Sequence, residues 1–387
     1  MGISAWVLFC LALMLVLSFN RSSLTVWGVA YLGYLSLFGV FSPFKTSLLV
    51  TLSIIWCVCF LPLLILPIRR QLLSRHLLRI YRRIMPRLSN AEKEAIEAGD
   101  VGFEKELFSG IPDWFALQKL PTVALSDEEQ AFIDGPVNEL CSLINNWEIS
   151  HCSHEIPDFI WEYLKSNGFF SLIIPKHYGG KEFSALAHSQ ILVKVASMNI
   201  SVATAMGVPN SLGPSELLLK YGTEEQKQKW LPRMASGELV GAIAMSEPGT
   251  GSDLQNVKTN AKKDGNGWII NGSKTFITNG GTANLIIVVA DTGGEGKHAK
   301  SLFVIETDDL EGFRRGRILD KVGMDAQDTA ELFFDEMKVP ADALLGPEPG
   351  MGFIQLMQEL PQERLNIAVQ GVAQMEAALE LTIEYCK

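Results

Sequence analysis

Two short stretches combine glycine with small polar side chains, a pattern typical of backbone that a ligand can approach closely. The first is AMSEPGTGSD, residues 244–253, and the second is TFITNGG, residues 275–281. Ser246 and Ser252 add hydroxyl groups that donate or accept hydrogen bonds. Because both stretches belong to one strand-rich segment, we expect them to face the same cleft and form a cofactor site. The alternative is that each is an ordinary turn.

Glu363, in the sequence PQERL, is the candidate general base. In a continuous helix, Leu356, Leu360 and Ile367 would lie at i−7, i−3 and i+4, and Glu363 would sit on an apolar stripe. A carboxylate in an apolar pocket is a stronger base and suits proton abstraction. The alternative begins a helix at Pro361, which makes Glu363 a first-turn acid near the helix dipole.

Charge and hydropathy divide the chain into a cationic apolar head and an acidic body. The first 91 residues hold nine Lys or Arg and no Asp or Glu, so all 43 acidic residues lie after them. Three apolar runs, residues 3–19, 24–41 and 47–68, are each near the ~20 residues that cross a bilayer. We predict a transmembrane segment of two or three helices over residues 1–68. A cleaved signal peptide is excluded because the apolar character resumes twice.

Residues 69–125 are predicted to form a basic amphipathic linker. Seven arginines lie between residues 69 and 87, and RRQLLSRHLLRIYRR has the pattern of an amphipathic helix that contacts anionic lipid. Arginines flanking an apolar segment favour the cytoplasmic side. We therefore expect a multi-pass anchor in a bacterial inner membrane, with the body in the cytoplasm. The acidic body excludes nucleic acid as the main partner.

The body is predicted to belong to the α+β class, with three parts. Residues 126–239 have helical periodicity, with capping boxes at Ser126 with Glu129 and at Thr223 with Gln226. Residues 240–345 are strand-rich, and the dipeptide at 271–272, Asn-Gly, predicts a hairpin turn. Residues 346–387 are helical again. The stretch HCSHE, residues 151–155, has no second half-site at zinc-like spacing, so we predict no metal.

Taken together, AMSEPGTGSD and INGSKTFITNGG resemble the paired signature of the flavin-dependent acyl-CoA dehydrogenases. The resemblance covers residues 126–387. The N-terminal part, through residues 207–238, is most similar to the membrane-associated bacterial enzymes of fatty-acid β-oxidation. From about residue 240, MDAQDTAELFFDEMKVP and LMQELPQERL are more similar to the long-chain enzymes. The resemblance implies an N-terminal helical domain, a middle antiparallel β-domain and a C-terminal four-helix bundle, of which this chain carries the first long helix.

The resemblance also implies the cofactor, FAD, and the residues that contact it. These are Ile243, Met245, Ser246, Gly251, Ser252, Phe276, Ile277 and Thr278. Thr278 would lie near the reactive N5 of the flavin, and Ser252 would also face the thioester arm of the substrate. Many members carry tryptophan where this chain has Phe276, so stacking against the flavin would lack an indole donor.

Glu363 matches the position from which the long-chain and isovaleryl-type members draw their base, and its neighbours Pro361, Gln362 and Arg364 are implied to contact substrate. In most other relatives the base is a later glutamate, which would lie beyond Lys387. That leaves open which glutamate acts.

The function implied is FAD-dependent dehydrogenation of medium- to long-chain acyl-CoA to trans-2-enoyl-CoA in fatty-acid β-oxidation. The implied partners are an electron-transfer flavoprotein as acceptor, membrane lipid, and further copies of the chain in a homo-oligomer once the bundle is complete. Two alternatives stay open. One is an acyl-CoA oxidase-like flavoenzyme that reduces oxygen, and the other is a truncated, non-catalytic protein that binds acyl-CoA or flavin at the membrane.

Overall fold

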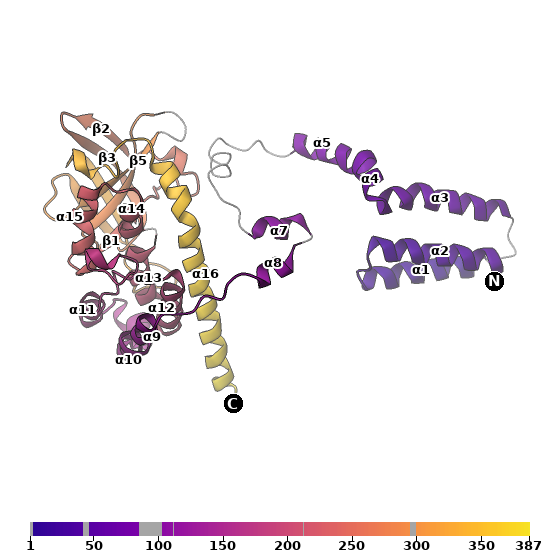
Figure 1. Ribbon diagram of the computed structural model, residues 1–387, viewed down its shortest axis with the longest axis horizontal. Coiled ribbons are helices and arrows are strands. Elements are labelled where there is room, and N and C mark those ends of the chain that lie inside the picture. Colours follow the sequence, from indigo (N-terminus) through magenta and orange to yellow (C-terminus); the bar gives the residue numbers. More distant parts are fainter. Residues whose placement is uncertain (1–2, 42–45, 85–102, 111, 212, 295–298) are drawn as a thin grey trace. The chain divides into compact units, whose positions relative to one another are not determined.

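The structure is a computed structural model that describes residues 3–41, 46–84, 103–110, 112–211, 213–294 and 299–387 (Figure 1). The chain divides into two compact units, Met1–Arg87 and Leu88–Lys387. Each unit is described by itself.

The first unit consists of helices. They are α1 (Ile3–Phe19), α2 (Leu24–Phe41), α3 (Thr46–Leu64), α4 (Leu66–Arg69) and α5 (Arg75–Ile84), with one π-helical turn, η1 (Arg70–Ser74), before α5. The first two predicted apolar runs are thus confirmed as helices, while the third is interrupted after Leu64. Trp6 of α1 packs edge-on against Tyr34 and Phe38 of α2, with ring centroids 5.8 and 5.2 Å apart. Such aromatic pairs add to the burial of apolar area.

One described helix, α2, is long and apolar enough to cross a bilayer. A second span would result if the bent pair Leu49–Leu64 and Leu66–Ile84 were counted as one helix. The α1 helix is apolar but shorter. The predicted basic helix forms as α4, η1 and α5, and every side chain of α5 is exposed. Its arginines are therefore available to an anionic surface.

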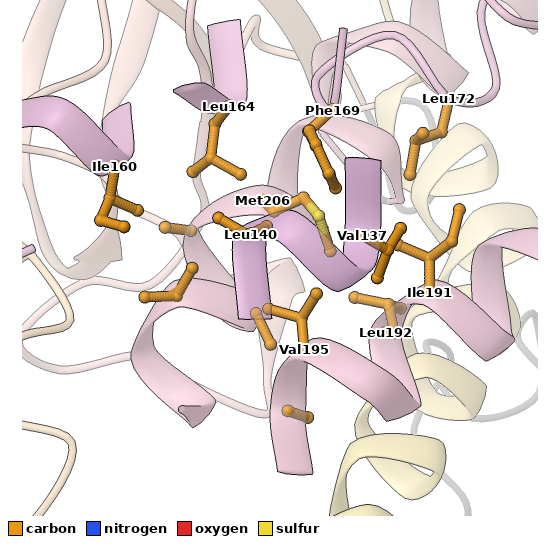
Figure 2. Packing of buried hydrophobic residues seen from close by; sticks show 14 of the residues in the cluster. Val137, Leu140, Ile160, Leu164, Phe169, Leu172, Ile191, Leu192, Val195 and Met206 are labelled. Carbon is orange, nitrogen blue, oxygen red and sulfur yellow. The ribbon is translucent and has the colours of Figure 1, made fainter. Parts of the chain in front are cut away.

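In the second unit, helices form the part between residues 104 and 235. They are α7 (Glu104–Ser109), α8 (Trp114–Gln118), α9 (Asp127–Phe132), α10 (Asn138–Leu143), α11 (Asp158–Ser166), α12 (Ala185–Met198), α13 (Ile200–Asn210), α14 (Pro214–Tyr221) and α15 (Glu224–Ala235). Both predicted capping boxes are confirmed, at the start of α9 and of α15. Figure 2 shows the core of this layer, where Leu140, Ile160 and Val195 from three helices meet and are fully buried.

The strands form one seven-stranded sheet. They are β1 (Gly241–Ala244), β2 (Asn260–Asp264), β3 (Gly267–Thr278), β4 (Leu285–Asp291), β5 (Lys300–Glu306), β6 (Phe313–Ile318) and β7 (Thr329–Pro340). The order is β1-β4-β2-β3-β7-β6, with β5 paired to β4. The predicted antiparallel arrangement is confirmed for most strand pairs, but β4 pairs in parallel with both β1 and β2. A long connection separates β1 from β4 in the sequence, so the chain can return as β4 beside β1 and run in the same direction.

The prediction of a hairpin turn at Asn271 and Gly272 is wrong. The chain turns instead between Asp264 and Gly267, which pair with each other at the end of β2 and β3. Asn271 lies within β3, where its side chain both donates to Oε1 of Glu336 and accepts from the Glu336 N–H, each at 2.8 Å. The register between β3 and β7 shifts at this point. The dipeptide therefore marks a β-bulge.

The last helix, α16 (Gly352–Tyr385), continues through Pro361, so the alternative in which a helix begins at Pro361 is wrong. The helix lies along α12, α13, α14 and β5 (Figure 1). Its first half buries Phe353 and Leu356, whereas near its end apolar side chains such as Leu379 and Ile383 are exposed. The helix thus presents its middle, which carries Glu363, to the rest of the second unit.

The bulge at Gly272 gives a stability prediction. Gly272 has φ 151°, and a Cβ there would lie 2.7 Å from Cα of Thr259. We expect Gly272→Ala to lower the free energy of unfolding by about 1–3 kcal/mol, because backbone or neighbour must shift. The measurement is the denaturant midpoint of the purified chain. The matched control is Gly249→Ala, whose added Cβ meets nothing within 4 Å. Equal midpoints for both variants would contradict the prediction.

Candidate active site

Two adjoining cavities lie where α13, the sheet and α16 meet. The large cavity has a volume of about 570 Å³ and the small cavity about 180 Å³. They share four lining residues, Val208, Ser211, Thr278 and Glu363. Glu363 therefore stands at the wall common to both.

The small cavity gathers most of the residues predicted to contact flavin. Six of the eight line it, namely Ile243, Met245, Ser246, Phe276, Ile277 and Thr278. The other two, Gly251 and Ser252, are exposed and line neither cavity. The start of the first motif thus meets residues 276–278 of the second motif at the small cavity.

Phe276 projects from an irregular point of β3. Its φ of 59° is unusual for an aromatic residue, and the register between β3 and β7 shifts between Lys274 and Ile277. The ring lines the small cavity and is 68% exposed. Strained backbone of this kind concentrates at ligand sites. An exposed aromatic ring beside the hydroxyls of Ser246 and Thr278 fits a flat ligand with polar edges, as FAD has.

A buried ion pair joins the two motifs. Nζ of Lys274, in β3, lies 2.9 Å from Oε1 of Glu247 and also donates to the Met245 carbonyl at 3.0 Å. The two charged side chains are 0% and 6% exposed. The Glu247 carboxylate also accepts the N–H groups of Lys258 and Thr259 at 2.7 and 2.9 Å. Sequence reasoning missed this pair, although Glu247 lies in AMSEPGTGSD and Lys274 lies in INGSKTFITNGG.

The electrostatics of the pair follow from its burial. Desolvation lowers the pKa of Lys274 to about 8, although the charge of Glu247 opposes that shift. Burial alone would raise the pKa of Glu247, but hydrogen bonds from Thr259 and Lys258, with the Lys274 charge, bring it below its usual value. The carboxylate is therefore ionised at neutral pH and fixes the loop after β1.

Further hydrogen bonds set the position of the second motif. The Thr275 N–H donates to the Ser246 carbonyl at 3.0 Å. Directly after β3, Nδ2 of Asn279 donates to the Ala205 carbonyl of α13 at 3.1 Å. Thr278 is thereby held between the sheet and α13, at the junction of the two cavities.

The Glu363 carboxylate is positioned by a hydrogen bond from the residue that follows α13. The Ser211 hydroxyl donates a hydrogen bond to Oε2 of Glu363. Of the predicted apolar stripe, Leu356 is buried, Leu360 lines the small cavity and Ile367 lines the large cavity. The predicted substrate contacts Pro361, Gln362 and Arg364 line neither cavity.

Two further carboxyl groups lie next to Glu363, and sequence reasoning missed them. Glu359, one turn earlier on α16, is 3% exposed and pairs with Nζ of Lys220 at 2.6 Å and the Tyr221 hydroxyl at 2.8 Å. Glu216 of α14 lies beside Glu359. Burial, followed by the charge and hydrogen bonding of Glu359, raises the pKa of Glu216 to about 8. A carboxyl group that holds its proton at neutral pH thus neighbours the candidate base.

The large cavity has a wall of mixed character. Apolar side chains include Ile200, Val208 and Ile367, while α16 contributes three amides at successive turns, Asn366, Gln370 and Gln374. Among the described residues, no group of three His, Cys, Asp or Glu side chains could hold a metal ion. The arrangement is therefore a carboxylate at the wall between two cavities.

Comparison with known proteins gives this arrangement a family. Residues 126–238 match the acyl-CoA dehydrogenase N-terminal domain, and residues 242–337 match the acyl-CoA dehydrogenase middle domain. The mitochondrial long-chain specific acyl-CoA dehydrogenase of Mus musculus is 44% identical over 236 residues, which cover 60% of this chain and 54% of that protein. An acyl-CoA dehydrogenase of Bacillus subtilis (strain 168) is 36% identical over 241 residues, covering 62% of this chain and 63% of that protein.

Solved structures agree. Acyl-CoA dehydrogenase from Geobacillus kaustophilus is 42% identical, with a TM-score of 0.63, and the match covers 68% of this chain and 70% of that one. Butyryl-CoA dehydrogenase from Megasphaera elsdenii is 32% identical, with a TM-score of 0.64 and the same coverage. This chain spans about half the length of the mitochondrial relative. The family is FAD-dependent. The paired motifs, the succession of helical part, sheet and long helix, and this match over more than two thirds of a solved relative show that the chain belongs to the acyl-CoA dehydrogenase family.

Proposed function

We propose that this chain is a membrane-tethered, FAD-dependent acyl-CoA dehydrogenase that acts on medium- to long-chain acyl-CoA. The observation that carries the proposal is the place of Glu363, at the wall shared by the flavin-type small cavity and the large cavity. A base at this wall can reach a substrate whose reacting carbons lie at the junction. The size of the large cavity supports an extended acyl chain, as does the similarity to long-chain specific relatives.

The proposed chemistry removes two hydrogens. Glu363 takes the proton from the α-carbon of the thioester, and the electron pair of that C–H bond forms the new double bond as a hydride leaves the β-carbon. FAD, when bound, supplies the acceptor for that hydride. Met245, Ser246, Phe276 and Thr278 would hold its ring in the small cavity. Ser211 keeps the Glu363 carboxylate pointed at the junction.

A flavin absorbance spectrum tests the proposal directly. The purified chain should carry yellow flavin, and anaerobic palmitoyl-CoA should bleach it. The reduced protein should then pass electrons to an electron-transfer flavoprotein. Stoichiometric hydrogen peroxide in air would favour the oxidase alternative instead. A chain that binds flavin and acyl-CoA but stays oxidised would count against the enzymatic proposal.

Glu363→Gln tests the base. The amide keeps the shape and can still accept from Ser211, but it cannot take the α-proton. We expect flavin and acyl-CoA to bind while the rate of flavin reduction falls at least about 100-fold, in the range that general-base catalysis contributes. Anaerobic stopped-flow absorbance measures that rate. Glu376→Gln is the matched control, because Glu376 is exposed on the same helix and lines neither cavity. Reduction of the Glu363→Gln variant at the parent rate would show that another group is the base.

The tether has its own test. We propose that the first unit anchors the chain in a bacterial inner membrane, with the body in the cytoplasm; the apolar helices and the acid-free, arginine-rich α4–α5 segment support this. Deleting residues 1–90 should move the protein from the membrane pellet to the soluble fraction. The control is the full chain washed in high salt, which should stay in the pellet because its attachment is apolar rather than purely electrostatic. Sedimentation of the deletion variant in high salt would place the tether elsewhere.

A further inference from the structure

Asn366 is a buried amide without a partner. It is 2% exposed, and among the described residues neither its Nδ2 nor its Oδ1 has a hydrogen-bond partner. A buried polar group in this state costs free energy unless something satisfies it. Because Asn366 lines the large cavity, an occupant of that cavity can supply the missing partner.

Most of the neighbouring polar groups already make hydrogen bonds. The Thr204 hydroxyl of α13 donates to Oε1 of Gln370 at 3.3 Å, and Nε2 of Gln374 donates to the Ala196 carbonyl. Nε2 of Gln327 donates to the Thr278 hydroxyl at 3.1 Å. Among the described residues that line this cavity, Oε1 of Gln327 is also buried without a partner, but Asn366 alone leaves both a donor and an acceptor unpaired.

The position of Asn366 relative to Glu363 indicates what it meets. The two residues are three positions apart on α16 and both line the large cavity, so Asn366 lies about 4.5 Å further along the helix axis. Six of the eight residues predicted to contact flavin line the small cavity, and of these only Thr278 also lines the large cavity. A substrate whose α-carbon is at Glu363 and whose acyl chain enters the large cavity therefore passes Asn366 a few carbons beyond the reacting bond.

On the basis of the proposed function, we propose that Asn366 is a specificity-determining residue that hydrogen-bonds a polar substituent on the acyl chain. The substrate class is acyl-CoA with a hydroxyl, keto or amide group several carbons from the thioester. A plain alkyl chain would leave the amide unsatisfied, whereas a hydroxyl supplies both an acceptor and a donor.

The test measures binding to the full, flavin-loaded chain by calorimetry. The probes are octanoyl-CoA and octanoyl-CoA carrying one hydroxyl, placed at each position from the fourth carbon to the last. We expect at least one hydroxylated isomer to bind about fivefold or more tightly than octanoyl-CoA, which corresponds to one net hydrogen bond. In Asn366→Leu the ratio of the affinities for that isomer and for octanoyl-CoA should fall to about one, and the melting temperature should not fall. Glu376→Leu, exposed on the same helix, should keep the preference.

Four outcomes would overturn the inference. If no hydroxylated isomer binds more tightly than octanoyl-CoA, the amide is satisfied by water. If the preference survives in Asn366→Leu, another residue recognises the hydroxyl. If Asn366→Leu weakens all probes equally, the amide contacts the CoA moiety shared by them. If no acyl-CoA binds at all, this inference and the proposed function both fail, whereas octanoyl-CoA binding without a hydroxyl preference overturns the inference alone.

Discussion

The site depends on one buried ion pair, Lys274 with Glu247. Removing one partner of such a pair typically costs about 3–5 kcal/mol, because the other charge is left buried and uncompensated. Here the pair does more than balance charge. Glu247 follows β1 and Lys274 lies in β3, so their contact brings Met245 and Ser246 to the same small cavity as Phe276 and Thr278. Gly249 and Gly251 allow the loop after β1 to adopt this conformation, but the ion pair determines where the loop lies.

The second constraint is the packing of α16 on the helical layer. Glu359 is pinned by Lys220 and Tyr221 of the α14 segment, and one turn later Ser211 holds Glu363. Two anchors a turn apart fix both the rotation and the axial position of the helix. That is why a residue from the end of the chain faces a sheet built from its middle.

Sequence reasoning succeeded where the signal was local. The capping boxes at Ser126 and Thr223 formed as predicted, because a cap needs only residues within one turn. It failed at Asn271, where an Asn-Gly turn signal was overridden by pairing with β7 and by the contact of Gly272 with Thr259, neither of which is visible locally. The roles of Glu216, Glu247, Lys274 and Asn366 were missed for the same reason. Each depends on a neighbour that only the tertiary fold supplies. By contrast, six of the eight residues predicted to contact flavin line one cavity, and they were predicted because two motifs were recognised together.

The two carboxyl groups beside Glu363 do not both carry an unpaired negative charge. Glu359 is compensated by Lys220, and Glu216, with its pKa raised to about 8, is largely neutral at pH 7. Glu363 therefore has two acidic neighbours, which together carry less unpaired negative charge than two free carboxylates would. Two unpaired carboxylates at these positions would repel any third carboxylate nearby, and the ion pair of Glu359 with the protonation of Glu216 reduces that repulsion. In this chain that balance is made by α14 and α16 together, outside both glycine-rich motifs.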